Sequence, residues 1–173
     1  MMGGKAYETK KIKSTASTLS NSPAHQQARC ITYSTKWNHV AVSNNYGDVN
    51  IIDYDDFNKR ITTLYKAREW CECISYSPDG NYIALGSHDD SIYVYKITNG
   101  EYHLHWSITF VHSSAIVGMD WTRDSRYLRA VDQAYAKQFY DVIECEQFKD
   151  GAQVLTSPNI WETSTCKLGW EVA

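Results

Sequence analysis

Apolar and polar residues alternate along much of this chain, in short stretches separated by turn residues. Apolar side chains at every second position lie on one face of an extended strand, whereas a helix needs them three and four residues apart. The middle of the chain predicts strands over 71–77, 82–87, 91–97 and about 103–109. The first two strands are separated by a turn that contains Pro78, Asp79 and Gly80. Proline fixes its own φ, and glycine adopts positive φ freely. The pattern therefore predicts an all-β fold built from hairpins.

The same pattern occurs three times. Residues 30–34 match residues 73–77 at four of five positions, at an offset of 43. At that offset the apolar residues Val40, Val42, Val49 and Ile51 fall on Ile83, Leu85, Ile92 and Val94. An offset of 45 places Tyr76, Asp79, Tyr82, Ile83 and Tyr95 over Trp121, Asp124, Tyr127, Leu128 and Tyr140. A period of about 43 to 45 residues with three or four strands is typical of a β-propeller blade.

The repeat predicts three four-stranded antiparallel blades within residues 28–173, at about 28–66, 67–110 and 111–157, followed by the start of a further blade. Three blades are too few for a closed ring, which takes about four to eight. We therefore expect two open blade faces. The chain would then be a fragment of a longer protein, the product of a truncated gene model, or a piece that must associate to be stable.

Residues 1–27 differ from the rest of the chain in composition and charge. They hold four lysines (Lys5, Lys10, Lys11 and Lys13) against one glutamate, with no apolar period, and we interpret them as a disordered basic tail. Such a tail either attracts acidic partners through its field or serves only solubility. The remaining residues hold 13 basic and 19 acidic groups, a net charge of −6, which argues against a nucleic-acid-binding domain.

Composition narrows the class of protein further. Apolar runs are far shorter than the roughly 18 to 20 residues of a membrane span, and no secretory signal is evident, so we expect no membrane partner. The five cysteines (Cys30, Cys71, Cys73, Cys145 and Cys166) have no regular spacing, which is typical of reduced thiols in a core. Both observations indicate the cytoplasm.

Several runs resemble the WD40-type propellers of the echinoderm microtubule-associated protein-like (EMAP-like) family. They are residues 65–72, 74–80 and 84–89, His112 to Ser114 ahead of Met119 to Trp121, and residues 161–169, which begin at Trp161. The resemblance covers roughly residues 28–173. It implies a non-enzymatic scaffold of the cytoplasm and cytoskeleton that binds tubulin or microtubules, without a cofactor. The alternative is a general WD40 scaffold with a different protein partner.

The resemblance also implies features that this sequence lacks. Family members carry two joined propellers behind an N-terminal coiled coil, yet residues 1–27 show no heptads. The turn aspartate that the middle repeat keeps as Asp89 is Tyr46 in the first repeat and Ala134 in the third. We therefore expect the blades to depend more on packing than on the hydrogen-bonded tetrad of the family.

Candidate chemistry is sparse. Cys71 and Cys73 are two residues apart, as are His103 and His105, so each pair would share a strand face and could contribute to a zinc site. Structural zinc prefers C-x₂₋₄-C pairs in turns, which favours core cysteines and no metal. No nucleophile, phosphate-loop or metalloprotease motif is found, and a tight turn explains His88-Asp89-Asp90 better than acid–base catalysis does.

Arg68, Glu69 and Trp70 are the predicted partner-binding residues. They precede an inner strand, on a rim of the propeller, where an arginine beside a tryptophan offers charge and a stacking surface. The structural alternative is that Trp70 packs between blades and Arg68 pairs with an acidic neighbour. The predicted structural residues of the blades are Pro78, Asp79, Gly80, Asp89, His112, Trp121 and Trp161.

Overall fold

The computed structural model describes residues 27–148 and 157–166 of the chain. It contains twelve strands and one short 3-10 helix: β1 (Ala28–Ser34), β2 (His39–Asn44), β3 (Val49–Asp53), β4 (Arg60–Leu64), β5 (Cys71–Tyr76), β6 (Tyr82–Ser87), β7 (Ile92–Thr98), β8 (Glu101–Ile108), β9 (Ile116–Trp121), β10 (Tyr127–Asp132), β11 (Lys137–Asp141), β12 (Glu146–Gln147) and η1 (Pro158–Ile160). Among these residues no helix is long and apolar enough to cross a membrane. The predicted tail lies, except for Gln27, outside the described residues.

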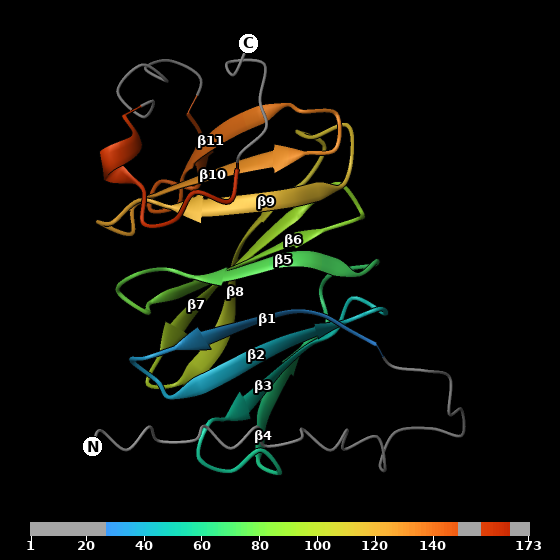
Figure 1. Ribbon diagram of the computed structural model, residues 1–173, viewed down its shortest axis with the longest axis vertical. Helices are drawn as coiled ribbons and strands as arrows, with labels where there is room; N and C mark the ends of the chain where they lie inside the picture. Colours follow the sequence, from blue (N-terminus) through green and yellow to red (C-terminus); the bar gives the residue numbers. More distant parts are fainter. Residues whose placement is uncertain (1–26, 149–156, 167–173) are drawn as a thin grey trace, which may run out of the picture.

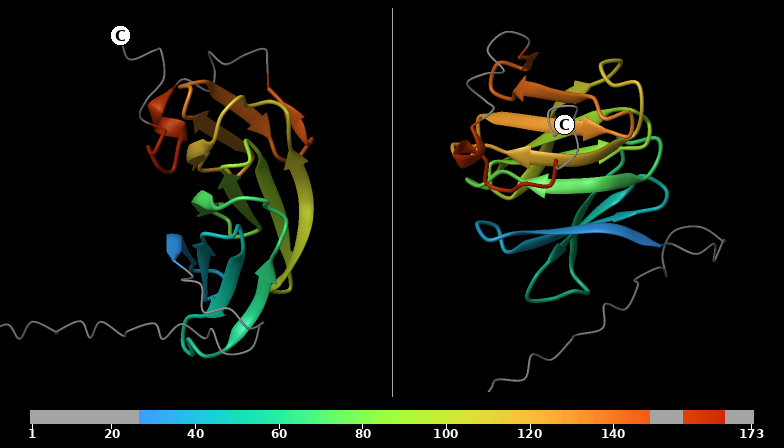
Figure 2. Two further views of the ribbon diagram at one scale, coloured as in Figure 1. Left: turned by 90° about the vertical axis from the view of Figure 1, so that its right-hand side faces the viewer. Right: turned by 45° about the horizontal axis from the view of Figure 1, so that its top comes forward.

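The strands form three separate antiparallel sheets in chain order, β1 to β4, β5 to β8 and β9 to β12. The inner strands β1, β5 and β9 lie side by side and run in the same direction, and the sheets fan out behind them (Figures 1 and 2). This is the all-β architecture of three propeller blades that the repeat predicts. The fourth strand, whose alternation is weakest in the sequence, forms as β8 over eight residues in the middle blade.

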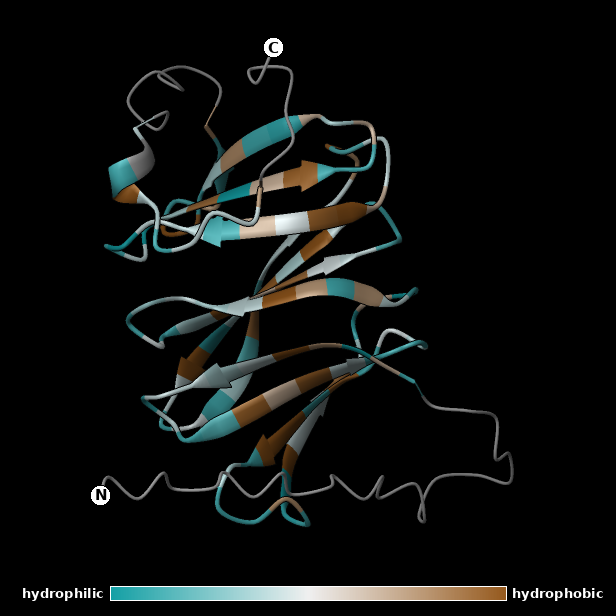
Figure 3. Ribbon diagram, in the orientation of Figure 1, coloured by the Kyte–Doolittle hydropathy of each residue, from teal (hydrophilic) through white to brown (hydrophobic). Residues whose placement is uncertain are grey.

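Two apolar clusters hold the blades together, one at each seam. Side chains of β6 alternate between them: Ile83 and Leu85 pack toward the first blade, and Tyr82 and Ala84 toward the third. Because both faces of the middle blade are covered, β6 is buried at all six positions. Apolar residues accordingly concentrate inside the strands and polar ones in the turns (Figure 3).

The two outer faces of the array differ. Ile31 and Tyr33 on β1 are 60% and 43% exposed, although Ile74 and Tyr76, one repeat later, are only 6% and 9% exposed against the first blade. The third blade, in contrast, buries Phe139 against Trp161 of its own C-terminal segment. The expectation of two open faces is therefore right for the first blade and wrong for the third, because residues 160–166 fold back over it.

The C-terminal segment lies against β9 and runs in the opposite direction. Thr122 and Trp161 form an antiparallel bridge, and Thr165 hydrogen-bonds the carbonyl of Met119 at 2.8 Å. The inner strand of each earlier blade instead runs parallel to its neighbour (Figure 1). That a further blade begins here remains a prediction.

The turn between β5 and β6 has the predicted chemistry. Gly80 adopts φ +69°, and the hydroxyl of Ser77 donates to the Asp79 carboxylate at 2.6 Å, while the Asp79 carboxylate accepts the Asn81 N–H at 2.9 Å. The third blade repeats the arrangement with Thr122 and Asp124, at 2.6 Å. Local side-chain hydrogen bonds therefore close both hairpins.

Gly86 permits close approach of the second and third blades. A Cβ at this position would lie 2.5 Å from Cys73 Sγ and 2.7 Å from Ile116 Cγ2. We expect Gly86→Ala to lower the free energy of unfolding by about 1 to 3 kcal/mol, since overpacking a dense seam forces its neighbours apart. Urea unfolding followed by circular dichroism measures the loss. Adding Cys73→Ala removes the nearer clash and should restore part of the stability; a double variant no better than Gly86→Ala would contradict this explanation.

Candidate functional site

The links between blades and the β2–β3, β6–β7 and β10–β11 turns all meet at one rim, which we call the link rim. It comprises residues 65–70, 109–115, 45–48, 88–91 and 133–136. This is the right-hand side of Figure 1 and faces the viewer in the left panel of Figure 2. The other hairpin turns form the opposite rim, which we call the turn rim.

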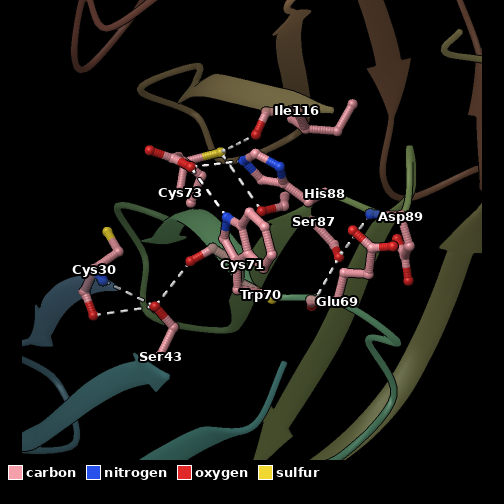
Figure 4. A network of polar contacts seen from close by, with 12 residues as sticks. Cys30, Ser43, Glu69, Trp70, Cys71, Cys73, Ser87, His88, Asp89 and Ile116 are labelled. Carbon is pink, nitrogen blue, oxygen red and sulfur yellow. Dashed lines mark hydrogen bonds and ion pairs between the residues drawn. The ribbon is translucent and has the colours of Figure 1, made fainter. Parts of the chain in front are cut away.

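Trp70 lies on the link rim, at the seam between the first and second blades. The Arg29 guanidinium is 5.1 Å from the indole centroid, and the His88 ring packs on the indole with centroids 4.4 Å apart. Glu72 joins the group, since its carboxylate accepts the indole N–H at 3.4 Å and lies 2.6 Å from His88 Nε2 (Figure 4). Trp70 thus packs between blades, which is the structural role that we gave as the alternative to partner binding.

Arg68 and Glu69 have exposed side chains on the same rim, while their backbone is fixed. The Arg68 N–H donates to Asp89 Oδ2 at 2.9 Å, and the Ser87 hydroxyl donates to the Glu69 carbonyl at 3.1 Å (Figure 4). The structure therefore places the three predicted binding residues together, with two charged side chains directed to solvent. Whether they bind a partner remains a prediction.

The Asp89 side chain connects the link at residues 65–70 to the turn at residues 88–91. Its Oδ2 also accepts the Tyr93 hydroxyl at 2.8 Å, whereas its buried Oδ1 has no hydrogen-bond partner among the described residues. Burial of Tyr93 and its hydrogen bond to Asp89 raise the pKa of that phenol to about 12. Asp89 therefore orders the rim, as a structural residue of the blade would.

The third blade contains a buried polar network although Ala134 replaces the turn aspartate. His112 Nδ1 lies 3.1 Å from Asp132 Oδ2, and the Tyr140 hydroxyl lies 2.7 Å from His112 Nε2. Because a carboxylate can only accept, His112 donates from Nδ1 and accepts from Tyr140 at Nε2. The expectation that packing replaces hydrogen bonding is thus wrong in this blade. At the offset of 45 residues, Ala134 corresponds to Asp89 and Asp132 corresponds to Ser87. The third blade therefore carries its carboxylate two residues earlier in the turn than the second blade does.

This network predicts a dependence of stability on pH. Burial lowers the pKa of His112 below its ordinary 6.5, although Asp132 opposes the shift. The contribution of His112 to stability is therefore fully present above that pH and is lost as the pH falls toward the lower pKa of the folded state. We expect the difference in unfolding free energy between wild type and His112→Gln to shrink from pH 7.5 to 5.5 in urea titrations. A constant difference would contradict the assignment.

The paired cysteines do not share a strand face, and the paired histidines have different partners. A bulge in β5 between Cys71 and Cys73 turns Cys71 toward the first blade and Cys73 toward Ile116 of the third. His103 contacts Glu101, while His105 lies 2.8 Å from the Val142 carbonyl. Within the described part of the chain no three potential ligands gather around one point. Burial raises the pKa of the Cys71 thiol to about 12, as expected for a core cysteine.

Sequence reasoning missed the exposed aromatic residues of the link rim. Phe110 is 96% exposed and adopts φ +63°, and Tyr135 is half exposed at φ +64°. A bulky residue in the left-handed region costs about 1 kcal/mol or more, so such positions are often functional. Tyr65 is also exposed, and Phe110 follows it by 45 residues, which is the offset of the third repeat. The sequence signal that could have identified these residues is the recurrence of aromatic residues in the links between blades rather than in the strands.

Comparison with known proteins decides the family. Residues 7–173 match the family model described as the echinoderm microtubule-associated protein second beta-propeller. The chain belongs to this family. The resemblance noted in the sequence, the WD40 propeller fold class and the EMAP-like relationship are therefore confirmed.

Curated relatives include the ciliary WD repeat-containing protein ctxp80 of Euplotoides octocarinatus, which is 38% identical over 78% of this chain and 18% of its own length. The human echinoderm microtubule-associated protein-like 3 is 31% identical over 77% of this chain and 15% of its length. This chain thus spans less than a fifth of either relative.

Solved structures agree on the fold. The WD40 repeats of RRP9 superpose with a TM-score of 0.65 at 14% identity, over 72% of this chain and 38% of that one. A chain of the mitotic checkpoint complex superposes with a TM-score of 0.62 at 18% identity, over 70% of this chain and 36% of that one. At such identities the likeness establishes the WD40 propeller fold alone.

Proposed function

We propose that this chain is part of a non-enzymatic EMAP-family scaffold of the cytoplasm and cytoskeleton, and that it binds tubulin or microtubules through the link rim. The match to the second propeller of the family carries the proposal. The relatives named microtubule-associated support the choice of partner.

The chemistry of the link rim supports binding rather than catalysis. Exposed aromatic residues and arginine are enriched at the centres of protein interfaces, and Phe110, Tyr65 and Arg68 are exposed on this rim. Burial raises the pKa of Cys71 and Cys73, which keeps these thiols protonated and poorly nucleophilic.

Co-sedimentation with polymerised tubulin tests the proposal. We expect the wild-type chain to pellet with microtubules and Phe110→Ala to bind about five- to tenfold more weakly, as loss of an interface anchor does. Phe110 is almost fully exposed, so its truncation spares the fold. Tyr54→Ala is the matched control, because Tyr54 is an exposed aromatic residue on the turn rim.

Two results would overturn the proposal. One is that neither this chain nor the longer protein containing it pellets with microtubules. The other is that Phe110→Ala and Tyr54→Ala both bind as wild type does, in which case the link rim is not the binding surface.

A further inference from the structure

We propose that the outer face of the third blade binds a polypeptide segment instead of stacking against another blade, and that residues 160–166, the C-terminal segment, are its ligand in this chain. Strand register gives no reason for this difference between blades, because β9, β10 and β11 pair with one another as β5, β6 and β7 do. The second blade is nevertheless covered by the inner strand β9, whereas the third is covered by a segment that contains no strand. The reason lies in the side chains of the face.

Two positions that are apolar in the stacking faces of the earlier blades are charged in the third. The residues of the first two blades at these positions are all buried in a seam: Ala41 and Ala84 at one position, Val49 and Ile92 at the other. After the same offsets of 43 and 45 residues, the third blade has Arg129 and Lys137. A third change lies on the inner strand, where Asp120 replaces Ser75. An apolar strand such as β9 would cover these charges without pairing them, which is strongly destabilising.

The C-terminal segment supplies the polar groups that this face requires. The Asp120 carboxylate is fully buried, and Arg129 satisfies part of it, with Nε and Nη2 each 2.9 Å from Oδ2. The segment donates three more hydrogen bonds to the carboxylate, those of the Thr163 hydroxyl, the Thr165 N–H and the Cys166 N–H, at 2.5 to 3.0 Å. Hydrogen bonds to an ionised acceptor are the strong ones, so the carboxylate selects a covering chain that offers N–H and O–H donors.

Trp161 is the apolar anchor of the segment. Its ring packs on Phe139 with centroids 6.0 Å apart, and the Arg129 guanidinium lies 4.3 Å from the indole centroid. The same arginine therefore contacts both the carboxylate and the anchor. An aromatic anchor in a pocket, followed by donors for a buried charge, is how a folded surface recognises a peptide. The face thus fits an extended segment with a tryptophan and with threonines two and four residues after it.

The segment also takes the place of a neighbouring inner strand. The inner strands β1 and β5 lie side by side, as do β5 and β9, so the next inner strand would lie beside β9. At that place the Glu162 N–H donates to the Trp121 carbonyl at 2.9 Å, and the Thr165 hydroxyl donates to the Met119 carbonyl at 2.8 Å. A further blade at this position would therefore meet the segment rather than β10 and β11. The run of directly stacked blades ends at the third blade.

Binding of the segment as a separate peptide tests the site. The full chain with the triple substitution W161A/T163A/T165A loses the anchor and two hydroxyl donors of its own segment. The probe is a fluorescein-labelled peptide of residues 157–166, with Cys166→Ser to prevent disulfide formation. We expect saturable binding to the triple variant by fluorescence anisotropy. Wild type should bind the peptide at least about tenfold more weakly, because its own tethered segment competes at a high effective concentration.

Substitutions in the peptide test recognition without disturbing the fold of the chain. The T163V/T165V peptide keeps the shape of both side chains but lacks their hydroxyl donors, so it should bind the triple variant at least about tenfold more weakly. Ser164→Ala is the matched control, because Ser164 is exposed between the two threonines. Its loss should change the affinity less than about twofold.

Native-state hydrogen exchange of wild type tests the proposal even if the triple variant does not fold. A bound ligand leaves its site without unfolding the protein, so the Thr165 and Cys166 amides should exchange at rates that low urea concentrations do not change. The amides of β9 and β10 should exchange through global unfolding, at rates that rise with urea. The same urea dependence for both sets would overturn the proposal, since the segment would then be as integral to the blade as a strand. Absence of peptide binding to a folded triple variant, or undiminished binding of the T163V/T165V peptide, would also overturn it.

Discussion

Asp120→Ala is expected to lower the free energy of unfolding by about 3 to 5 kcal/mol, because it removes one partner of a buried charge pair. Asp120 is fully buried on β9, and Arg129 Nη2 lies 2.9 Å from its Oδ2 and is almost as buried. Without Asp120 the guanidinium stays buried beneath the C-terminal segment, near Trp161, without its counter-ion. This loss is among the largest that we expect from one substitution.

The Asp120 carboxylate also anchors the C-terminal segment. It accepts from the Thr163 hydroxyl at 2.5 Å, the Thr165 N–H at 2.8 Å and the Cys166 N–H at 3.0 Å. Burial by itself would raise the pKa of Asp120, but these hydrogen bonds and that of Arg129 hold it well below its usual value. Its stabilisation is therefore present above the ordinary aspartate pKa of 3.8 and is lost as the pH falls below it.

Urea unfolding of Asp120→Ala, followed by circular dichroism and tryptophan fluorescence, measures the effect. Asp120→Asn is the matched control, because it retains one acceptor and the volume but loses the charge, and it should cost less than alanine. Limited proteolysis should also cut Asp120→Ala within residues 161–166 faster than wild type. A loss below about 1 kcal/mol, with an uncut segment, would show that Asp120 anchors nothing.

Trp121→Ala is expected to cost about 3 to 5 kcal/mol, as removal of a buried tryptophan does in other cores. Trp121 is fully buried in the seam between the second and third blades, where its ring stacks near Tyr82 at a centroid distance of 6.2 Å. Its indole N–H donates to the Ser75 carbonyl of the preceding inner strand at 3.2 Å. The side chain thus joins two blades by packing and by hydrogen bonding.

Thermal and urea unfolding of Trp121→Ala test this role, with Trp121→Phe as the control that keeps an aromatic ring. Phenylalanine should retain more than half of the lost stability, since it removes the hydrogen bond, worth about 1 kcal/mol, and part of the volume. A chain already unfolded at 25 °C would agree with the expectation for alanine. An unfolding midpoint equal to that of wild type would refute it.

The strand pattern was predictable because blade packing repeats. Side chains of β6 alternate between two seams, so the period of two and the offsets of 43 and 45 residues appear directly in the sequence. Turn chemistry at Asp79 and Gly80 was predictable for the same reason, since its hydrogen bonds are local. Neither property depends on how distant parts of the chain meet.

Side-chain placement at the inner strands was less predictable. A bulge at the start of β5 places Cys71 and Cys73 on different faces, and the inner strands β1 and β9 contain comparable bulges. A single extra residue reverses the faces of all that precede it, and no residue type marks it. The zinc hypothesis required Cys71 and Cys73 to lie on one face of a regular strand. The bulge separates the two side chains, so this requirement is not met.

By itself the sequence determined the all-β class, the three repeats, the EMAP resemblance and the presence of Arg68, Glu69 and Trp70 in a link between blades. Only the tertiary structure decided that Trp70 packs with His88 and that Asp120 holds residues 161–166. The physical reason is distance along the chain. Periodicity and turns are set by neighbouring residues, whereas these contacts join residues 18 to 46 positions apart in the folded chain.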